Sequence, residues 1–589
     1  AVEGLDLALE RRLRGADALL VLDNCEHLLQ PAAELAHSLL RASPDLRVLA
    51  TSREILDVPG EAAYPVPPLD VPGAGDDAAV VGESEAVRLL VERARLARHG
   101  LQVDAAGFET AARIVRELDG LPLAIELAAA RAKVLSLEEI ADRLQNRFEV
   151  LVSHQRLTAA RHRTLREAMD WSFDLLEPDE QRLLARLSVF PGGATLASIA
   201  AVCLSGDEAA AERLVERLVD TSLVMPIESR RGTRYRLLET VREYAAGHVP
   251  EEALPALLRR HAERVRELTA RTNLGLEGAG RPQEFDLARD ELASIRSAIR
   301  WATTEDPALG LEIACALERF WATNQPREGL AAFDALIAAA VEIPDALRAR
   351  AHRCRGGCAY ASGDFKRGVE DYERALELFR SLGRRADVGH MLMRLGHEAR
   401  RLGDRERAAS LLAESIETAG KDRHVPDRYV GAVLDADLAF DAGRTDDALR
   451  VLADAAALAG ASLDPWWQGD ILLFLAEYAL DLGKLDEGGQ AAREGLALGR
   501  QIGSRASTVY AVALLAREAA AKGDAHRAGR IWGGLEAEVE RGAVGQWEAE
   551  HDAFRARVAE LAGSGFHAGV AEGRRLAFDA VVEESTTPA

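Results

Sequence analysis

The sequence predicts a mainly α-helical protein that begins with a small α/β segment and ends in a solenoid of stacked helical hairpins. Ala, Leu, Arg and Glu dominate, and aromatic residues make up only 5% of the chain. This mixture favours helices, because such side chains lose little freedom in them. Near the N-terminus an apolar run, an amphipathic stretch and a second apolar run follow one another, and towards the C-terminus landmarks recur every 40 positions.

Composition and charge limit the class of protein. The chain has 589 residues, of which 48% are hydrophobic and 29% charged, so it is expected to be globular. Its formal net charge of -23 disfavours nucleic-acid binding by the chain as a whole. Five cysteines are too few for a disulfide framework, and the sequence contains neither a signal peptide nor a long apolar run. We therefore expect a cytoplasmic location, and a first residue Ala1 suggests a fragment or a processed chain.

The N-terminal pattern predicts a βαβ unit. Residues 18–23, ALLVLD, have the character of a parallel strand buried on both faces. The apolar stripe over 28–40 predicts a helix, and 47–51, RVLAT, predicts the second strand. Residues 64–69 contain two prolines and predict an edge strand or an extended segment.

Two helical blocks are expected next. A Gly- and Asp-rich linker over 72–82 precedes a helical pattern over 84–144, which Gly120 and Pro122 interrupt. The block over 163–249 ends in a short strand at 235–238 and a helix that opens at Glu239. Helices followed by a strand and a final helix suit a winged-helix fold.

A 40-residue repeat predicts the solenoid. The repeated dipeptides begin with Gly363, Gly403, Gly443, Gly483 and Gly523. Small residues follow five positions later, at Gly368, Ala408, Ala448, Gly488 and Ala528. Twelve positions after each glycine stand Ala375, Ser415, Ala455, Gly495 and, as the exception, Leu535. We interpret each glycine as the turn of a helical hairpin and the small residues as the places where its helices cross. The tail from Glu583 is expected to be disordered.

Three segments carry candidate binding chemistry. Asp23 ends the first strand, where α/β sheets bind ligands, although an aspartate there can also cap the following helix. Arg53 follows the second strand and could reach a phosphate, or could simply be a solvated loop residue. Gly120 and Pro122 could present a rigid apolar surface to a nucleotide base, or form an ordinary helix break.

In this order the segments resemble the STAND class of signalling ATPases. The likeness is closest to bacterial transcriptional regulators of the AfsR and LuxR (MalT-like) kinds, whose ATPase core is similar to the NB-ARC module. The matching segments are LLVLDNCEHL (19–28), VLATSRE (48–54), LDGLPLAIELAAAR (118–131), HRTLREAMDWSFDLLEPDEQRLLARLSVFPGG (162–193) and YRLLETVREYA (235–245).

The resemblance implies a switch between ADP- and ATP-bound states. Asp23 would be the Walker B carboxylate and would hold Mg²⁺ through water, with Asn24 beside it. Arg53 would be the sensor arginine, and Gly120 and Pro122 would contact the base. ATP or ADP and Mg²⁺ would be the cofactors of the complete protein. The winged helix would act as a lid over the nucleotide rather than as a DNA reader.

Three departures from the family pattern bear on activity. No GxxxxGK[ST] phosphate loop occurs in the sequence, so the chain is expected to be truncated before Walker B, to bind no nucleotide alone and to be inactive. Asn24 replaces a second acid, and an amide is no general base. Leu237, Leu238 and Glu239 stand where the family often carries Met-His-Asp, so a phosphate-sensing lid histidine is absent from these positions.

The expected domains follow from these segments. They are the C-terminal half of a P-loop α/β domain (1–75), a helical domain with the Gly-Leu-Pro-Leu motif (76–155), a winged-helix lid (156–250), a helical linker (251–340), TPR-like repeats (341–565), and a terminal helix with a disordered tail (566–589).

Other candidate sites are weaker. His352, Cys354 and Cys358 could hold a metal, but small cysteines packed inside a hairpin explain them better. Trp466 and Trp467 could form a ligand platform, but buried anchors between repeats are the simpler interpretation. The Arg-rich stretch 156–166 could touch phosphates or form a solvated helix face.

Three functions compete. The favoured one is the regulatory and sensor part of an ATP/ADP-switched transcriptional regulator, whose repeats bind a ligand or a protein partner. The alternative is a nucleotide-independent scaffold with a degenerate ATPase remnant. A transcription factor that reads DNA through this winged helix is the third, which the acidic charge disfavours. DNA is expected to bind only through a domain outside this chain, no membrane contact is expected, and oligomerisation could accompany activation. A phosphate loop encoded just upstream of Ala1 would favour the switch.

Overall fold

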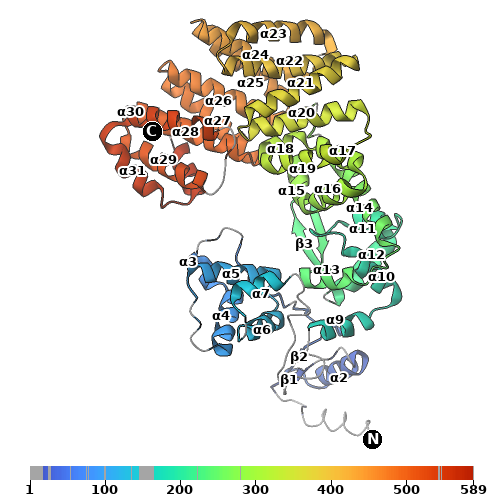
Figure 1. The fold of residues 1–589 in the computed structure, drawn as a ribbon. Helices are drawn as coiled ribbons and strands as arrows, with labels where there is room; N and C mark the ends of the chain where they lie inside the picture. The colour runs from blue at the N-terminus through green and yellow to red at the C-terminus, as the bar shows by residue number, and fades with distance from the viewer. Residues whose placement is uncertain are drawn as a thin grey trace. The chain divides into compact units, whose positions relative to one another are not determined.

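The computed structural model forms two compact units, residues 1–261 and 262–589, and both are mainly helical (Figure 1). It describes the chain except for residues 1–12, 14–16, 24, 26–27, 53–54, 65, 74–75, 77, 99–100, 102, 134, 145–164, 222, 273, 277, 279, 423, 541–543, 545–546 and 588–589. The expected fold class, mainly α with an α/β segment, a winged helix and a hairpin solenoid, is confirmed.

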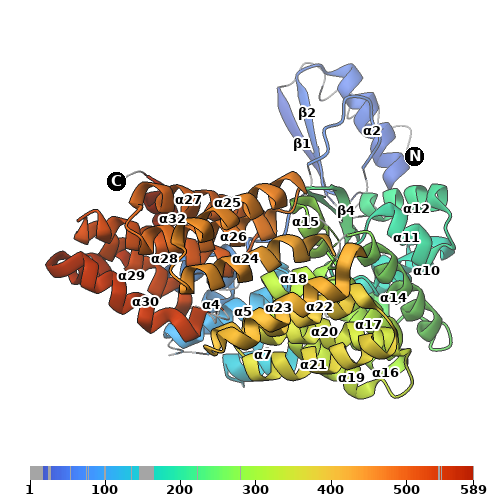
Figure 2. The same cartoon turned by 90° about the horizontal axis from the view of Figure 1, so that it is seen from above.

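The first unit begins with the expected βαβ segment. Strands β1 (Ala18–Leu22) and β2 (Leu46–Ala50) pair in parallel, and α2 (Leu29–Ala42) connects them and lies beside them (Figure 2). The expectation that β1 is buried on both faces is wrong. Alternate residues are exposed, Leu19 by 62% and Val21 by 54%, as is Leu49 of β2 by 54%. Within the described residues, α2 covers one face of this two-stranded sheet. Because side chains alternate between the two faces of a strand, every second side chain lies on the uncovered face.

Five helices form the second part of this unit. They are α3 (Ala78–Glu83), α4 (Glu85–Ala97), α5 (Ala105–Glu117), α6 (Pro122–Arg131) and α7 (Leu137–Arg143). The Asp104 carboxylate caps α5 by accepting from the Gly107 amide, and Ser136 with Glu139 forms a capping box on α7. The helices enclose one apolar core of Leu, Val, Ile and Ala. The helical pattern expected over 84–144 is confirmed.

The third part is a winged helix. Its elements are α9 (Leu165–Asp174), α10 (Pro178–Leu187), α11 (Leu196–Cys203), α12 (Glu208–Asp220), β3 (Met225–Ser229), β4 (Gly232–Arg236) and α13 (Glu239–Ala246). β3 and β4 pair in antiparallel fashion, and Ala194 forms an isolated antiparallel bridge with Tyr235 of β4. The expected strand therefore lies at 232–236, and the helix opens at Glu239 as expected. Helix α14 (Leu254–Ala270) follows.

The second unit opens with short helices that lead into the repeats. They are α15 (Pro282–Asp290), α16 (Leu292–Glu305), α17 (Pro307–Ala316), α18 (Glu318–Asn324) and α19 (Pro326–Ala339). These helices share one apolar core with the start of the first hairpin, and Ile502, from far along the chain, also belongs to that core.

Five hairpins with the expected 40-residue period follow. They are α20 (Asp345–Ala361) with α21 (Phe365–Ser381), α22 (Arg385–Arg401) with α23 (Arg405–Ala419), α24 (Val425–Asp441) with α25 (Thr445–Ala461), α26 (Pro465–Asp481) with α27 (Leu485–Ile502), and α28 (Arg505–Ala521) with α29 (Ala525–Glu540). A short 3-10 turn, η4 (Gly420–Asp422), lies before α24. All five landmark glycines have positive φ, from 74° to 88°, which the missing Cβ allows. The small landmark residues such as Ala408 and Ala448 are fully buried.

Three more helices follow the fifth hairpin. They are α30 (Trp547–Ala562), α31 (Phe566–Gly573), which follows the 3-10 turn η5 (Gly563–Gly565), and α32 (Phe578–Thr586). α30 packs against α28, whereas α31 and α32 pack against α29. Gly563, which has a φ of +73°, stands 40 positions after Gly523. The expectation of a disordered tail from Glu583 is wrong, because α32 continues to Thr586 and buries Val581 and Val582.

Among the described helices, none combines the length and the apolar character that crossing a bilayer requires.

Helices α29 and α31 pack in close contact. Gly529 and Gly533 of α29 face Gly569 and Gly573 of α31, backbone against backbone. A Cβ built on Gly533 would lie 2.2 Å from the Val570 carbonyl oxygen. The two helices can pack this closely only because all four positions lack a side chain.

We expect Gly533→Ala to lower the melting temperature of the chain. The added methyl group must push α31 away, and overpacking of this kind costs about 1–3 kcal/mol. Gly357→Ala is the matched control, because a Cβ on Gly357 of α20 would meet only the Tyr372 hydroxyl oxygen at 3.9 Å. That control should be neutral or stabilising by up to about 1 kcal/mol. Equal melting temperatures for both variants would contradict the close packing.

Candidate functional site

Asp23 and Thr51 lie together at the carboxyl ends of the two parallel strands. The Thr51 hydroxyl donates a hydrogen bond of 2.6 Å to the Asp23 carboxylate, and the Cys25 amide donates to the Thr51 carbonyl at 2.9 Å. The sequence placed both residues at strand ends, and parallel strands present those ends at one edge of the sheet. Of the neighbouring candidates, Asn24 and Arg53 lie outside the described residues.

Gly120 forms a tight turn against an extended segment. Asp119 and Gly120 both have positive φ, 53° and 66°. The Leu69 amide donates to the Gly120 carbonyl at 3.1 Å, and a Cβ on Gly120 would lie 2.1 Å from the Leu69 carbonyl oxygen. Only glycine fits this position. Pro122 then begins α6 at its first turn, where a missing amide hydrogen costs nothing, and it is exposed.

Asp119 connects this turn to the winged helix. Its carboxylate accepts hydrogen bonds from the backbone amide of Thr240 at 3.0 Å and from the Thr240 hydroxyl at 3.5 Å. Thr240 is the second residue of α13, so Asp119 caps the amino-terminal end of that helix from another domain. Sequence reasoning missed this role, because the two residues are 121 positions apart.

The three residues at the expected lid motif serve the winged helix itself. Leu237 is buried in its apolar core, and the partly buried Leu238 packs against that core. Glu239 accepts a hydrogen bond of 2.8 Å from Nε of Arg242 on the same helix. That bond is the main reason why the pKa of Arg242 is raised. The side chain that aligns with the family's acidic residue is therefore engaged within α13.

The described residues fit a magnesium nucleotide in part. Asp23 would hold Mg²⁺ through water at the sheet edge, and the exposed Pro122 would lie against the base. A bound nucleotide would supply negatively charged phosphates, which backbone amides and a lysine of a phosphate loop normally cradle. The sequence contains no such loop.

The second helix of the helix-turn-helix, α12, presents a mixed and net acidic face. Its exposed charged side chains are Glu208, Glu212, Arg213, Glu216 and Arg217. In a DNA-reading winged helix this helix enters the major groove beside the phosphates. Three carboxylates against two guanidinium groups would be repelled there. The wing carries the exposed arginines Arg230, Arg231 and Arg236 against the exposed Glu228, so the argument from charge applies to α12 alone.

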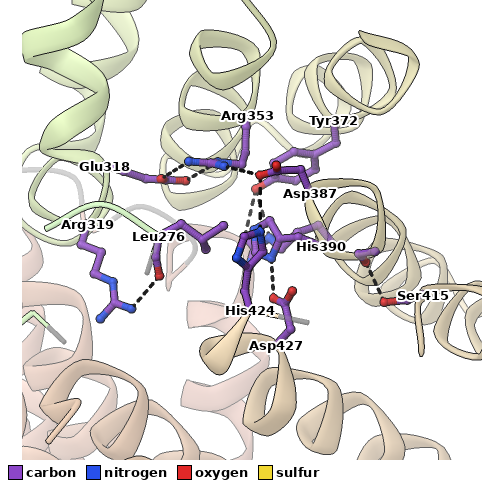
Figure 3. Close-up of polar contacts among 12 residues, drawn as sticks. Leu276, Glu318, Arg319, Arg353, Tyr372, Asp387, His390, Ser415, His424 and Asp427 are labelled. Atoms are coloured by element: carbon purple, nitrogen blue, oxygen red, sulfur yellow. Dashed lines mark hydrogen bonds and ion pairs between the residues drawn. The ribbon is translucent and has the colours of Figure 1, made fainter. Parts of the chain in front are cut away.

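A buried polar cluster lies among the first helices of the hairpins in the second unit (Figure 3). The Arg353 guanidinium of α20 donates two hydrogen bonds to the Glu318 carboxylate of α18, the shorter at 2.8 Å. Arg353 also donates to Asp387 of α22 at 3.1 Å, and His424, before α24, lies 3.4 Å from the same carboxylate. Next to them, Nδ1 of the His390 ring lies 2.5 Å from a carboxylate oxygen of Asp427. We call these six residues the inner polar cluster.

The charges of the inner polar cluster stabilise one another. Burial alone would raise the pKa of Glu318, but the charge and hydrogen bonds of Arg353 more than offset it and lower that pKa. The pKa of Asp387 is lowered in the same way, because His424 and Arg353 overcome the effect of burial. Buried ions of this kind persist only when they are paired. The cluster therefore fixes the relative positions of α18, α20, α22 and the start of α24.

The remaining sequence candidates occupy structural positions. Cys354 and Cys358 are buried in the apolar core of the second unit, whereas His352 binds Asp371 at 2.8 Å. Trp466 packs against that core, and Trp467 packs against Trp466, with ring centroids 4.8 Å apart. Most of the Arg-rich stretch at 156–166 lies outside the described residues.

Comparison with known proteins gives several relatives. Residues 176–249 match the model of a winged helix-turn-helix domain. A Mycobacterium tuberculosis protein named as an HTH-type transcriptional regulator is 36% identical over 334 residues, which cover 56% of this chain and 36% of that protein. An uncharacterised M. tuberculosis protein is 38% identical over 256 residues, covering 42% of this chain and 62% of its own length. The chain thus spans about a third to three fifths of these relatives.

Two further similarities cover most of the chain. The regulatory protein AfsR of Streptomyces griseus is 26% identical over 588 residues, covering 88% of this chain and 57% of AfsR. A Pyrococcus horikoshii STAND protein with a tetratricopeptide repeat sensor aligns with a TM-score of 0.30 and 14% identity, over 94% of this chain and 85% of that one. Such a TM-score does not establish a shared overall arrangement. The sequence relatives and the winged-helix match confirm the resemblance of this chain to bacterial transcriptional regulators, including AfsR.

Proposed function

We propose that this chain is the regulatory and sensor portion of an ATP/ADP-switched signal-transduction protein of the cytoplasm, a transcriptional regulator whose repeats bind a ligand or protein partner. The named relatives support the regulatory role. The observation that carries the switch is the Asp119 cap, because it ties the turn that would contact the base to α13 of the winged helix. A nucleotide that moved this turn would strengthen or weaken the cap and so move the winged helix.

We place the DNA-binding activity of the regulator outside residues 1–589. The acidic exposed face of α12 supports this placement, as does the net charge of -23. The winged helix would then transmit the nucleotide state. The alternative proposal, a nucleotide-independent scaffold, would use the repeats alone. The paired charges of the inner polar cluster hold helices in fixed positions, which suits a rigid scaffold as well as a sensor.

The switch predicts a nucleotide-dependent change at α13. In the longest polypeptide that the gene encodes, ADP and ATP should protect α13 to different extents in hydrogen–deuterium exchange. Asp119→Ala should abolish that difference and cost about 1 kcal/mol, the usual effect of losing a helix cap. Asp104→Ala, which removes the α5 cap inside the helical domain, should leave the difference intact. Identical protection of wild-type α13 by both nucleotides would favour the scaffold.

Residues 1–589 alone are expected to release no phosphate from ATP above background. Neither a phosphate loop nor a second acid beside Asp23 is present in this sequence to position the phosphates and the attacking water. A phosphate-release assay measures this directly. Hydrolysis by the wild-type chain that disappears in Asp23→Ala would show this expectation to be wrong.

The chain is also expected to bind duplex DNA weakly and without a steep dependence on salt. Binding through several phosphate contacts would lose roughly a thousandfold in affinity between about 50 and 200 mM salt. Fluorescence anisotropy with a labelled duplex at both salt concentrations tests this. Tight binding at low salt that is lost both at high salt and in Arg230→Ala/Arg231→Ala would revive the DNA-reading hypothesis.

A further inference from the structure

Helix α18 carries two adjacent charged residues that are buried against different hairpins. Glu318 binds Arg353 of α20, in the first hairpin, as part of the inner polar cluster. Arg319 binds Asp464, which directly precedes α26 of the fourth hairpin. One short helix from outside the repeats therefore contacts two hairpins whose partner residues lie 111 positions apart, from 353 to 464.

The Arg319–Asp464 contact is an almost fully buried ion pair. A guanidinium nitrogen of Arg319 donates to the Asp464 carboxylate at 2.8 Å, and the two side chains are 2% and 1% exposed. The Tyr429 hydroxyl donates to the same carboxylate oxygen at 2.6 Å. The other guanidinium nitrogen of Arg319 donates to the Leu276 carbonyl at 3.1 Å, as Figure 3 shows. The guanidinium carbon also lies 5.5 Å from the ring centroid of Trp466.

A second zone of contact lies next to this pair. The Asn324 side-chain amide, at the end of α18, donates to the Gly503 carbonyl at 2.9 Å. The Arg289 guanidinium of α15 donates to the Ile502 carbonyl. Ile502 is 1% exposed and belongs to the apolar core of the helices that precede the repeats. Polar and apolar contacts thus bring the same two parts of the chain together.

These contacts complete a ring of helices. The first helices of successive hairpins pack in series, α22 against α24, α24 against α26 and α26 against α28. Arg353 joins α20 to α22 through Asp387. Helix α18 contacts both α20 and α28, and so connects the two ends of the series from α20 to α28. We propose that α18, held by the Arg319–Asp464 pair, is a clasp that joins the first helices of the first and fourth hairpins. We propose further that these hairpins move apart when the clasp is released.

A buried ion pair suits a clasp better than a simple stabiliser. Compared with an apolar pair of similar size it adds little net stability, because both charges lose their water. Losing one partner is costly, because the other charge is left buried and unpaired. Opening returns both charges to water together, so the intact pair resists opening less than an apolar contact of similar size would. A partner that supplied an alternative ligand for Arg319 or Asp464 would favour the open state. That regulatory consequence rests on the proposed sensor function, whereas the clasp itself does not.

Asp464→Asn in the full chain tests the clasp. Asparagine keeps the size of the side chain and an oxygen that can cap α26, but leaves Arg319 without its counter-charge. Hydrogen–deuterium exchange should become faster in α18 and in the first turns of α26 and α28, on the order of a hundredfold. Exchange in α21 and α23, which lie away from the clasp, should stay unchanged. Asp446→Asn is the matched control, because Asp446 of α25 forms an exposed ion pair with Lys484, which directly precedes α27.

Asn324→Ala gives a second, milder variant. It removes the hydrogen bond to Gly503 without burying a charge, so the chain should remain folded and show the same local pattern to a smaller extent. Unchanged exchange in α18 with both variants would overturn the clasp. Faster exchange spread evenly over all hairpins would also overturn it, because the pair would then be a general stability contact. Neither result depends on a nucleotide or an effector, so failure of the clasp is distinguishable from failure of the proposed switch.

Discussion

The backbone geometry at the hairpin turns is the constraint on which the second unit depends. Every hairpin turns at a glycine with a left-handed backbone and crosses at a buried small residue. This keeps the spacing at 40 residues, so that first helices of neighbouring hairpins meet at a nearly constant offset. Pairs such as Arg353 with Asp387 and His390 with Asp427, 34 and 37 residues apart, are a consequence of that offset. The inner polar cluster could not form if one turn changed its length.

Local patterns made much of the fold predictable. The turn glycines, the crossing residues and the strand-and-helix end of the winged helix all lie within a few residues of the signal that indicates them. The continuation of the 40-residue spacing to Gly563 was not recognised, because Gly563 is followed by Ser564 and Arg575 stands where a small residue is usual. The burial of β1 was also misjudged, since an apolar run does not reveal whether one face or two will be covered.

The candidate site was predictable only where the strand ends define it. Asp23 and Thr51 meet because parallel strands end at one edge. Asp119 with Thr240, and Arg319 with Asp464, join residues 121 and 145 positions apart. A charged residue in a single sequence carries no mark of its distant partner, because pairing depends on how the helices pack. Both long-range pairs nevertheless occur where one domain or segment is attached to another.

The burial of every cysteine gives the molecule a set of internal reporters. Cys25 lies beside the sheet, Cys203 in the winged helix, and Cys315, Cys354 and Cys358 in the core of the second unit. Alkylating reagents attack the thiolate, and burial raises the pKa of Cys203 to about 12. Each thiol would therefore react only after its own surroundings open. The order in which the five sites are alkylated would record which part of the chain loosens first, without any introduced label.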